Sequence, residues 1–237
     1  MTIAIQAPCW AQSFRPSVTE SILDLGHRLG LDLLAPKGQT CCGLPAWEAG
    51  HTDAAMDAAR QTLRVFDGFG AIVSPSPSCL RMMREHIPAL LYDQPEADGA
   101  RSLAERSVGW CDYLVQEIGV ESLRLRFEGN IAFYRPCQQE DDKSLRLLLS
   151  NIQSATLAPD LTEQCCGFGN NLAWRHPELS KAIAGPVVGA MRLSRADLII
   201  TTDVGCLLHL EPLLQVAGAP PILHLAEFLA QTLTAEL

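Results

Sequence analysis

Short apolar runs alternate along the chain with segments in which apolar residues recur at helical spacing. Three runs in the first half have the length and the flanking Gly or Pro residues of buried strands. They are IAIQAP at 3–8, LDLLAP at 31–36 and AIVSPS at 71–76. The pattern therefore predicts three strands that are separated by helices.

Two segments between these runs have the pattern of amphipathic helices. The first starts at Ser17 and Glu20, which have the spacing of a capping box, and the second precedes the third strand. The apolar faces are formed by Val18, Ile22, Leu25 and Leu29 in the first helix and by Met56, Ala59, Leu63 and Phe66 in the second. Strands that alternate with helices are typical of right-handed βαβ crossovers and a parallel sheet.

The same order of landmarks returns in the second half of the chain. The expected strands are IAFYRP at 131–136, SATLAP at 154–159 and LIITTD at 198–203, and one helical face is formed by Leu179, Ile183, Val187 and Met191. A duplicated unit explains this agreement. We therefore expect an α/β fold of two pseudo-twofold related βαβ halves with mostly parallel sheets, in residues 1–125 and 126–237.

Composition and charge narrow the class of protein. The 237 residues include 18 Lys and Arg against 27 Asp and Glu, which gives a formal net charge of −9 and makes a nucleic-acid partner unexpected. The N-terminus has no basic segment ahead of its apolar residues, and no apolar run approaches the roughly 20 residues of a membrane-spanning helix. These features predict a cytoplasmic protein without an integral membrane segment, associated with a membrane only through partners.

Nine cysteines are many for a cytoplasmic chain, where thiols stay reduced, so metal binding or redox chemistry explains them better than disulfides. In each half a single cysteine, a Cys-Cys-Gly triplet and a last cysteine follow one another. The gaps are 31 and 36 residues in the first half and 27 and 39 in the second. We call these sets the first quartet (Cys9, Cys41, Cys42 and Cys79) and the second quartet (Cys137, Cys165, Cys166 and Cys206).

The quartets fall at one edge of the predicted sheets. Cys9 and Cys79 follow the carboxyl ends of strands, and Cys41 and Cys42 lie in the loop beyond another. Open α/β sheets bind ligands at that edge. Four thiolates match the ligand number of an iron-sulfur cluster and of a closed zinc site. The chain has no Cys-x-x-Cys zinc knuckle, so one or two clusters of the 4Fe-4S type are preferred, with zinc as the alternative.

These motifs resemble, over nearly the whole chain, the cysteine-rich CCG-domain proteins. The family pattern is Cys, a long gap, Cys-Cys-Gly, a second gap and Cys-x-x-Cys, repeated twice. Within it, the chain is most similar to the lactate-utilisation protein A family, and more distantly to glycolate oxidase iron-sulfur subunits and to the B subunit of heterodisulfide reductases. The closing segment ILHLAEFL, with His224 and Glu227, is also similar to the end of that family.

The chain departs from the family pattern at three places. Ser76 and Asp203 stand where each Cys-x-x-Cys motif has its first cysteine. Each could supply an oxygen ligand or leave an iron open to a substrate, and turn chemistry explains both nearly as well. The segment after Cys137 is shorter than the family's, so the first half matches the pattern more closely. Outside the quartets, Cys111 is expected to be a core thiol. His209, three residues after Cys206, could reach the edge of a cluster, but a lone histidine on a helix is more often an ordinary core or surface residue.

The resemblance implies an iron-sulfur electron-transfer subunit of a multi-component oxidoreductase that converts L-lactate, or a similar 2-hydroxy acid, to the 2-oxo acid. The chain has no flavin or nicotinamide fingerprint, so other iron-sulfur or flavin subunits are its expected partners, and no catalytic residue is assigned. Two alternatives stay open. One is a thiolate-zinc protein with a structural or assembly role, and the other is a subunit of a thiol-disulfide enzyme like the heterodisulfide reductases.

Overall fold

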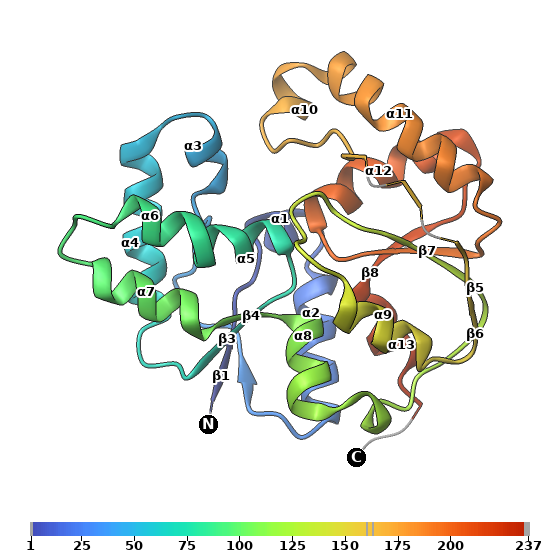
Figure 1. Ribbon diagram of the computed structural model, residues 1–237, viewed down its shortest axis with the longest axis horizontal. Helices are drawn as coiled ribbons and strands as arrows, with labels where there is room; N and C mark the ends of the chain where they lie inside the picture. Colours follow the sequence, from blue (N-terminus) through green and yellow to red (C-terminus); the bar gives the residue numbers. More distant parts are fainter. Residues whose placement is uncertain (1, 160, 163, 235–237) are drawn as a thin grey trace. The chain divides into compact units, whose positions relative to one another are not determined.

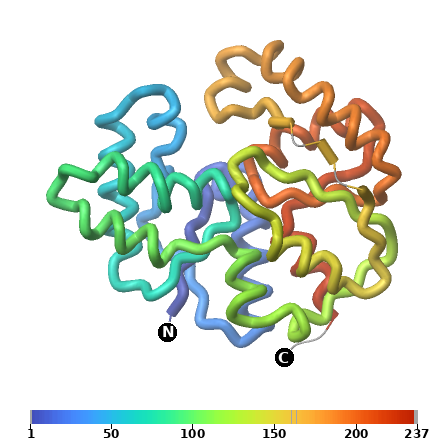
Figure 2. The backbone as a smooth tube through the Cα atoms, in the orientation of Figure 1, coloured from blue at the N-terminus to red at the C-terminus, as the bar shows by residue number. Residues whose placement is uncertain are grey.

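The computed structural model describes residues 2–159, 161–162 and 164–234. The chain divides into two compact units, Met1–Tyr113 and Leu114–Leu237. Figure 1 shows that each unit has its own sheet and its own helices, and the tube in Figure 2 follows the chain through the first unit before it enters the second. The expected repeat boundary at residue 125 stays a prediction.

The first unit contains a four-stranded sheet with the order β2-β1-β3-β4, in which every neighbouring pair is parallel. Its strands are β1 (Ile3–Ile5), β2 (Leu33–Leu34), β3 (Ala71–Ser74) and β4 (Ser107–Gly109). Its helices are α1 (Cys9–Phe14), α2 (Ser17–Arg28), α3 (Leu44–Glu48), α4 (Thr52–Val65), α5 (Pro77–Arg81), α6 (Ile87–Leu90), α7 (Ala97–Arg106) and α8 (Trp110–Tyr113), with a π-helical turn, η1 (Met82–His86), between α5 and α6.

The second unit repeats this topology with the order β6-β5-β7-β8, again parallel throughout. Its strands are β5 (Arg126–Tyr134), β6 (Gln153–Leu157), β7 (Leu198–Thr201) and β8 (Ile222–His224). Its helices are α9 (Lys143–Ser150), α10 (Leu172–Arg175), α11 (Pro177–Leu193), α12 (Val204–Ala217) and α13 (Leu225–Thr232), and the turns η2 (Leu114–Ile118) and η3 (Val120–Ser122) precede the sheet.

The α/β class and the parallel strands predicted from the apolar runs are confirmed. All six predicted strands are present. The central strands are buried, as in β3, where Ile72 and Val73 are fully buried, whereas the edge strands β2 and β6 are largely exposed. The fourth strand of each sheet was not predicted. Both β4 and β8 have only three residues, too few for a run that stands out from the helix that follows.

Two details of the helix predictions were wrong. Pro16 is the N-cap of α2, so Ser17 already lies in the first turn, and no side chain caps this helix. On α11 the buried face includes Ser180, Ala184, Val187 and Met191, whereas Leu179 is 53% exposed. Ser180 is buried because its hydroxyl has a hydrogen-bond partner inside the unit, which a count of apolar residues does not reveal.

A capping box at the last helix fixes the end of the second sheet. The backbone N–H of His224 donates to Glu227 Oε2 at 3.2 Å, and the Nδ1 atom of His224 accepts from the N–H of Ala226. Since Nδ1 accepts, Nε2 carries the proton and donates to the carbonyl of Thr202 at 3.0 Å. These buried bonds tie α13 to the residue that follows β7, close in sequence to the last cysteine of the second quartet.

Candidate metal centre

The structure brings the four sulfurs of the first quartet together. Cys42 Sγ lies 3.7 Å from Cys79 Sγ. The thiol of Cys9 is hydrogen-bonded to Cys41, and Cys41 to Cys42. Cys42 and Cys79 are buried, while Cys9 and Cys41 are partly exposed. The contacts therefore link the sulfurs in a row that leads from the surface into the unit.

Two helix starts and one loop at the carboxyl edge of the sheet supply these thiols. Cys9 is the first residue of α1, beyond β1, and Cys79 lies in α5, beyond β3. Cys41 and Cys42 precede Gly43, whose φ of +96° lets the chain turn directly after them. A Cβ at Gly43 would lie 3.3 Å from the carbonyl oxygen of Ala55, so the loop packs tightly on α4. The backbone N–H of Gly43 points at Cys41 Sγ, 3.5 Å away.

The second quartet has the same arrangement at the edge of the second sheet. Cys137 Sγ lies 3.7 Å from Cys165 Sγ, and Cys166 Sγ lies 3.0 Å from Cys206 Sγ. Cys165 and Cys166 are also hydrogen-bonded through their thiols. Cys166 and Cys206 are buried, and Cys137 is exposed. Cys137 lies in a loop after β5, whereas Cys9 starts a helix, in keeping with the short segment seen in the sequence.

One thiol in each row is held in its ionised form. Hydrogen bonds from Cys42 and Cys9 lower the pKa of Cys41 to about 3. In the same way, hydrogen bonds from Cys137 and Cys166 hold the pKa of Cys165 far below its usual value. The hydrogen bond to Cys41 and burial raise the pKa of Cys9. The first cysteine of each Cys-Cys-Gly triplet is thus a thiolate.

This charge distribution predicts which thiols react first in reduced, metal-free protein. An ordinary cysteine, with a pKa of about 8.5, is mostly protonated at pH 6, where Cys41 and Cys165 are ionised. Iodoacetamide is therefore expected to modify these two residues at pH 6, well before Cys111, whose pKa is raised by burial. Peptide mapping by mass spectrometry checks this. A rate at Cys41 that rises about tenfold per pH unit up to pH 8, as for an ordinary thiol, would contradict it.

The two residues that replace family cysteines serve as helix caps. Asp203 is the N-cap of α12, and its Oδ1 atom accepts from the N–H groups of Gly205 and Cys206, at 2.9 and 3.2 Å. Ser76 is the N-cap of α5, and its hydroxyl lies 3.0 Å from that of Ser78. Both are buried beside the last cysteine of their quartet. The side chain of Asp203 therefore caps its helix, whereas that of Ser76 makes no capping hydrogen bond. A role of either residue as an additional ligand stays a prediction.

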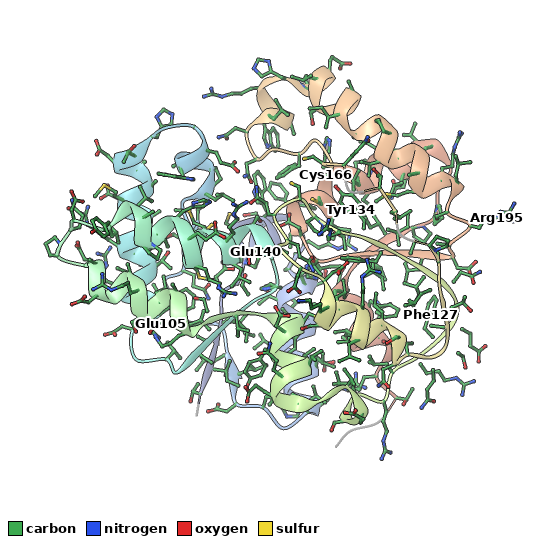
Figure 3. All side chains as sticks on the ribbon, viewed as in Figure 1. Glu105, Phe127, Tyr134, Glu140, Cys166 and Arg195 are labelled. Carbon is green, nitrogen blue, oxygen red and sulfur yellow. The ribbon has the colours of Figure 1, made fainter. Side chains whose placement is uncertain are left out.

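Two residues near the second quartet were not predicted to matter. Tyr134 is fully buried, donates to the carbonyl of Gln164 at 2.9 Å, and has a pKa raised by burial and by the nearby thiols. Figure 3 labels it together with Cys166. Ser180 reaches the second triplet from α11. Neither shows a sequence signal, because Tyr134 lies in an apolar strand and Ser180 is a small residue on a helix.

The four cysteines of each quartet suit a metal-sulfur group, although in this structure their sulfur atoms contact one another directly. Each quartet consists of four soft thiol ligands, and backbone N–H groups point at Cys41, Cys165 and Cys166, as they do toward the sulfurs of bound clusters. Over residues 2–159, 161–162 and 164–234, no group of three or more His, Cys, Asp or Glu has the spacing that holds a single ion. The residues therefore fit such a group by chemistry, and binding it requires the sulfurs to separate.

Two α/β units that each gather four cysteines at the carboxyl edge of a parallel sheet define a duplicated cysteine-rich domain protein. The cysteine-rich domain family CCG matches residues 3–84 and 131–211, which contain the two quartets. The chain belongs to this family.

Known relatives agree with this assignment over the full length. Lactate utilization protein A of Geobacillus kaustophilus is 30% identical and covers 97% of this chain and 98% of its own. The protein of the same name from Bacillus pumilus is 29% identical, with 97% and 99% covered. A hypothetical protein from Helicobacter pylori has a similar fold, with a TM-score of 0.68 at 14% identity over this whole chain, which spans about half of that one (49%). None of the described helices is long and apolar enough to cross a membrane.

Proposed function

We propose that this protein is an iron-sulfur electron-transfer subunit of a multi-component oxidoreductase. The observation that carries the proposal is the pair of thiol quartets, each assembled from three separate segments at the edge where parallel sheets bind ligands. The first quartet would hold one cluster of the 4Fe-4S type and the second quartet another. When bound, such a cluster supplies a site that accepts and releases one electron.

The side chains around the quartets support this role by controlling charge and solvent. The first cysteine of each triplet is already ionised, so this thiol has no proton to release when a cluster binds. The inner cysteines are buried, which lowers the local dielectric, while Cys9 and Cys137 lie toward the surface. An electron would therefore enter or leave each site at its exposed end, where a partner subunit can approach.

The relatives suggest the reaction that the complex performs. Proteins named Lactate utilization protein A match this chain from end to end. We assign the subunit to a lactate-utilisation system that oxidises L-lactate, or a similar 2-hydroxy acid, to the 2-oxo acid, with quinone as the class of final acceptor. The partners would be other iron-sulfur or flavin subunits, because a two-electron oxidation needs a cofactor that can take both electrons from the substrate.

Anaerobic purification tests the cluster assignment. We expect iron and acid-labile sulfide in equal amounts, little zinc, and broad visible absorption near about 400 nm that bleaches on reduction. Full-length protein that contains neither iron nor this absorption after anaerobic reconstitution would refute the assignment. The quartet variants in the Discussion are the matched controls, since each removes one site and leaves the other intact.

A thiolate-zinc protein is the second candidate, and two sulfur–sulfur distances favour it. In a tetrahedral site with Zn–S bonds of about 2.3 Å, neighbouring sulfurs are roughly 3.8 Å apart. The Cys42–Cys79 and Cys137–Cys165 separations are both 3.7 Å, whereas Cys166–Cys206, at 3.0 Å, is shorter. However, the contacts form a row and not a tetrahedron, and the adjacent cysteines of each triplet suit a larger cluster better. Stoichiometric zinc that survives anaerobic preparation would establish this candidate instead.

A further inference from the structure

Two polar side chains, on α11 and α12, hold the second Cys-Cys-Gly loop through hydrogen bonds. The Ser180 side chain, on α11, is fully buried, and its hydroxyl donates to the carbonyl oxygen of Gly167 at 2.7 Å. His209, on α12, places Nε2 3.1 Å from the same hydroxyl. Because the hydroxyl proton points at Gly167, His209 must donate from Nε2 to Ser180. The two residues therefore form a directed chain of hydrogen bonds that ends on the loop.

This chain of hydrogen bonds acts on a sulfur through one peptide group. The carbonyl of Gly167 and the N–H of Phe168 belong to the same rigid, planar peptide. That N–H points at Cys166 Sγ, 3.5 Å away. When Ser180 fixes the carbonyl on one side, it also fixes the direction of the N–H on the other side. The pair thus orients a hydrogen-bond donor toward a buried sulfur without touching the sulfur.

Ring packing keeps the same peptide in place. The rings of Phe168 and His209 have centroids 6.1 Å apart. A Cβ at Gly205, next to the last cysteine of the quartet, would come within 2.6 Å of the Phe168 ring, so that ring lies directly over the start of α12. His209 therefore interacts with two groups that hold the loop, the hydroxyl of Ser180 and the ring of Phe168.

The first unit has apolar residues at the corresponding places. A Cβ at Gly43 would face the carbonyl of Ala55 and the methyl group of Met82, just as one at Gly167 would face the carbonyl of Ser180. Ala55 thus corresponds to Ser180. Met82 corresponds to His209, since each is the third residue after the last cysteine of its quartet. Neither Ala55 nor Met82 has a side-chain donor, so the two loops are held by different chemistry.

We propose that Ser180 and His209 are a positioning pair that orients the Gly167–Phe168 peptide toward Cys166 and so makes the second thiol site chemically distinct from the first. The inference rests on the proposed function for its importance, since hydrogen bonds to sulfur are one of the means by which proteins set the potential and the lability of a cluster. The orientation of the peptide itself does not depend on a bound metal.

Hydrogen exchange on the full-length, reduced, metal-free chain tests the pair directly. For Ser180→Ala and His209→Met we expect the peptide covering 164–172 to exchange roughly five- to tenfold faster, as for the loss of one net hydrogen bond. His209→Gln retains a donor and should stay within about twofold of wild type. The peptide covering 40–46 should not change. His27→Gln, at an exposed histidine on α2 of the first unit, is the control and should change neither peptide.

A second measurement addresses the metal-bound protein. With the first quartet disabled by Cys42→Ser, iron should leave the second site faster under a chelator in Ser180→Ala and His209→Met, and at the wild-type rate in His209→Gln. The proposal is overturned if Ser180→Ala leaves the exchange rate at 164–172 unchanged, or if His209→Gln speeds this exchange as much as His209→Met does. It is also overturned if β5 exchanges as fast as the loop in these variants, because that would indicate general unfolding. If wild-type protein holds no iron, the proposed function fails, while the exchange result still decides the role of the pair.

Discussion

Replacing Gly167 with alanine is expected to destabilise the protein more than the same replacement at Gly43 or Gly185. Gly167 has a φ of +83°, and a Cβ there would lie 2.4 Å from the carbonyl oxygen of Ser180, a backbone atom of α11 that cannot move alone. The left-handed backbone costs about 1–2 kcal/mol for a residue with a side chain, and the overlap adds to it. We expect a loss of at least ~3 kcal/mol, a fall of roughly 6–12 °C in Tm, measured by calorimetry on metal-free protein.

Two other glycines provide matched controls for this replacement. Gly43→Ala has the same backbone strain, but the nearest atom is the Ala58 methyl group at 3.1 Å, so the loss should be smaller, about 1–2 kcal/mol. Gly185→Ala lies on α11 with no atom within 4 Å, and it should leave stability unchanged or raise it by up to about 1 kcal/mol. Equal melting temperatures for Gly167→Ala and Gly185→Ala would show that the loop does not pack on α11 as described.

The second large effect is expected from single cysteine replacements that separate the two sites. Cys42→Ser and Cys166→Ser each remove the buried central sulfur of one quartet. A serine hydroxyl does not ionise near neutral pH and is a poor ligand for iron, so the affected site should lose its metal. Each variant should retain about half of the wild-type iron and sulfide, since the other quartet keeps its four thiolates. Elemental analysis after anaerobic reconstitution measures this.

The control for both variants is Cys111→Ser. Cys111 lies in α8 outside the quartets, and burial raises the pKa of its thiol, so its replacement should leave the iron content unchanged. Cys42→Ser and Cys166→Ser together should abolish iron binding. A single variant that empties both sites would show that the two quartets bind one shared group, and a single variant that keeps all its iron would remove that cysteine from the ligand set.

Much of the fold could be predicted because each half carries the same pattern twice. The strands before Cys9 and Cys137 are short apolar runs ended by proline, and the match between the halves placed the loops of both quartets at the same sheet edge. The thiols could be grouped from spacing alone, since long gaps between cysteines are closed by the return of the chain to that edge. The structure brings their sulfurs together, while their role as ligands stays a prediction.

The features that were missed depend on tertiary contacts. Ser180 lies outside the predicted apolar face, yet it is buried because the carbonyl of Gly167 accepts from its hydroxyl. His209 looked like an isolated histidine, and its partner is 29 residues away in the sequence. The strand β8 is too short to detect, and it is defined by the register of Thr201 with His224. Local periodicity reports none of these contacts, because each joins segments that only the fold brings together.

Mössbauer spectroscopy of anaerobically prepared, isotopically enriched full-length protein tests the central claim most directly. The account predicts sulfur-coordinated cluster iron in wild-type protein, about half as much of it in Cys42→Ser and in Cys166→Ser, and none in the double variant. Wild-type protein that shows no cluster iron after reconstitution, and instead carries one zinc ion per quartet, would contradict it.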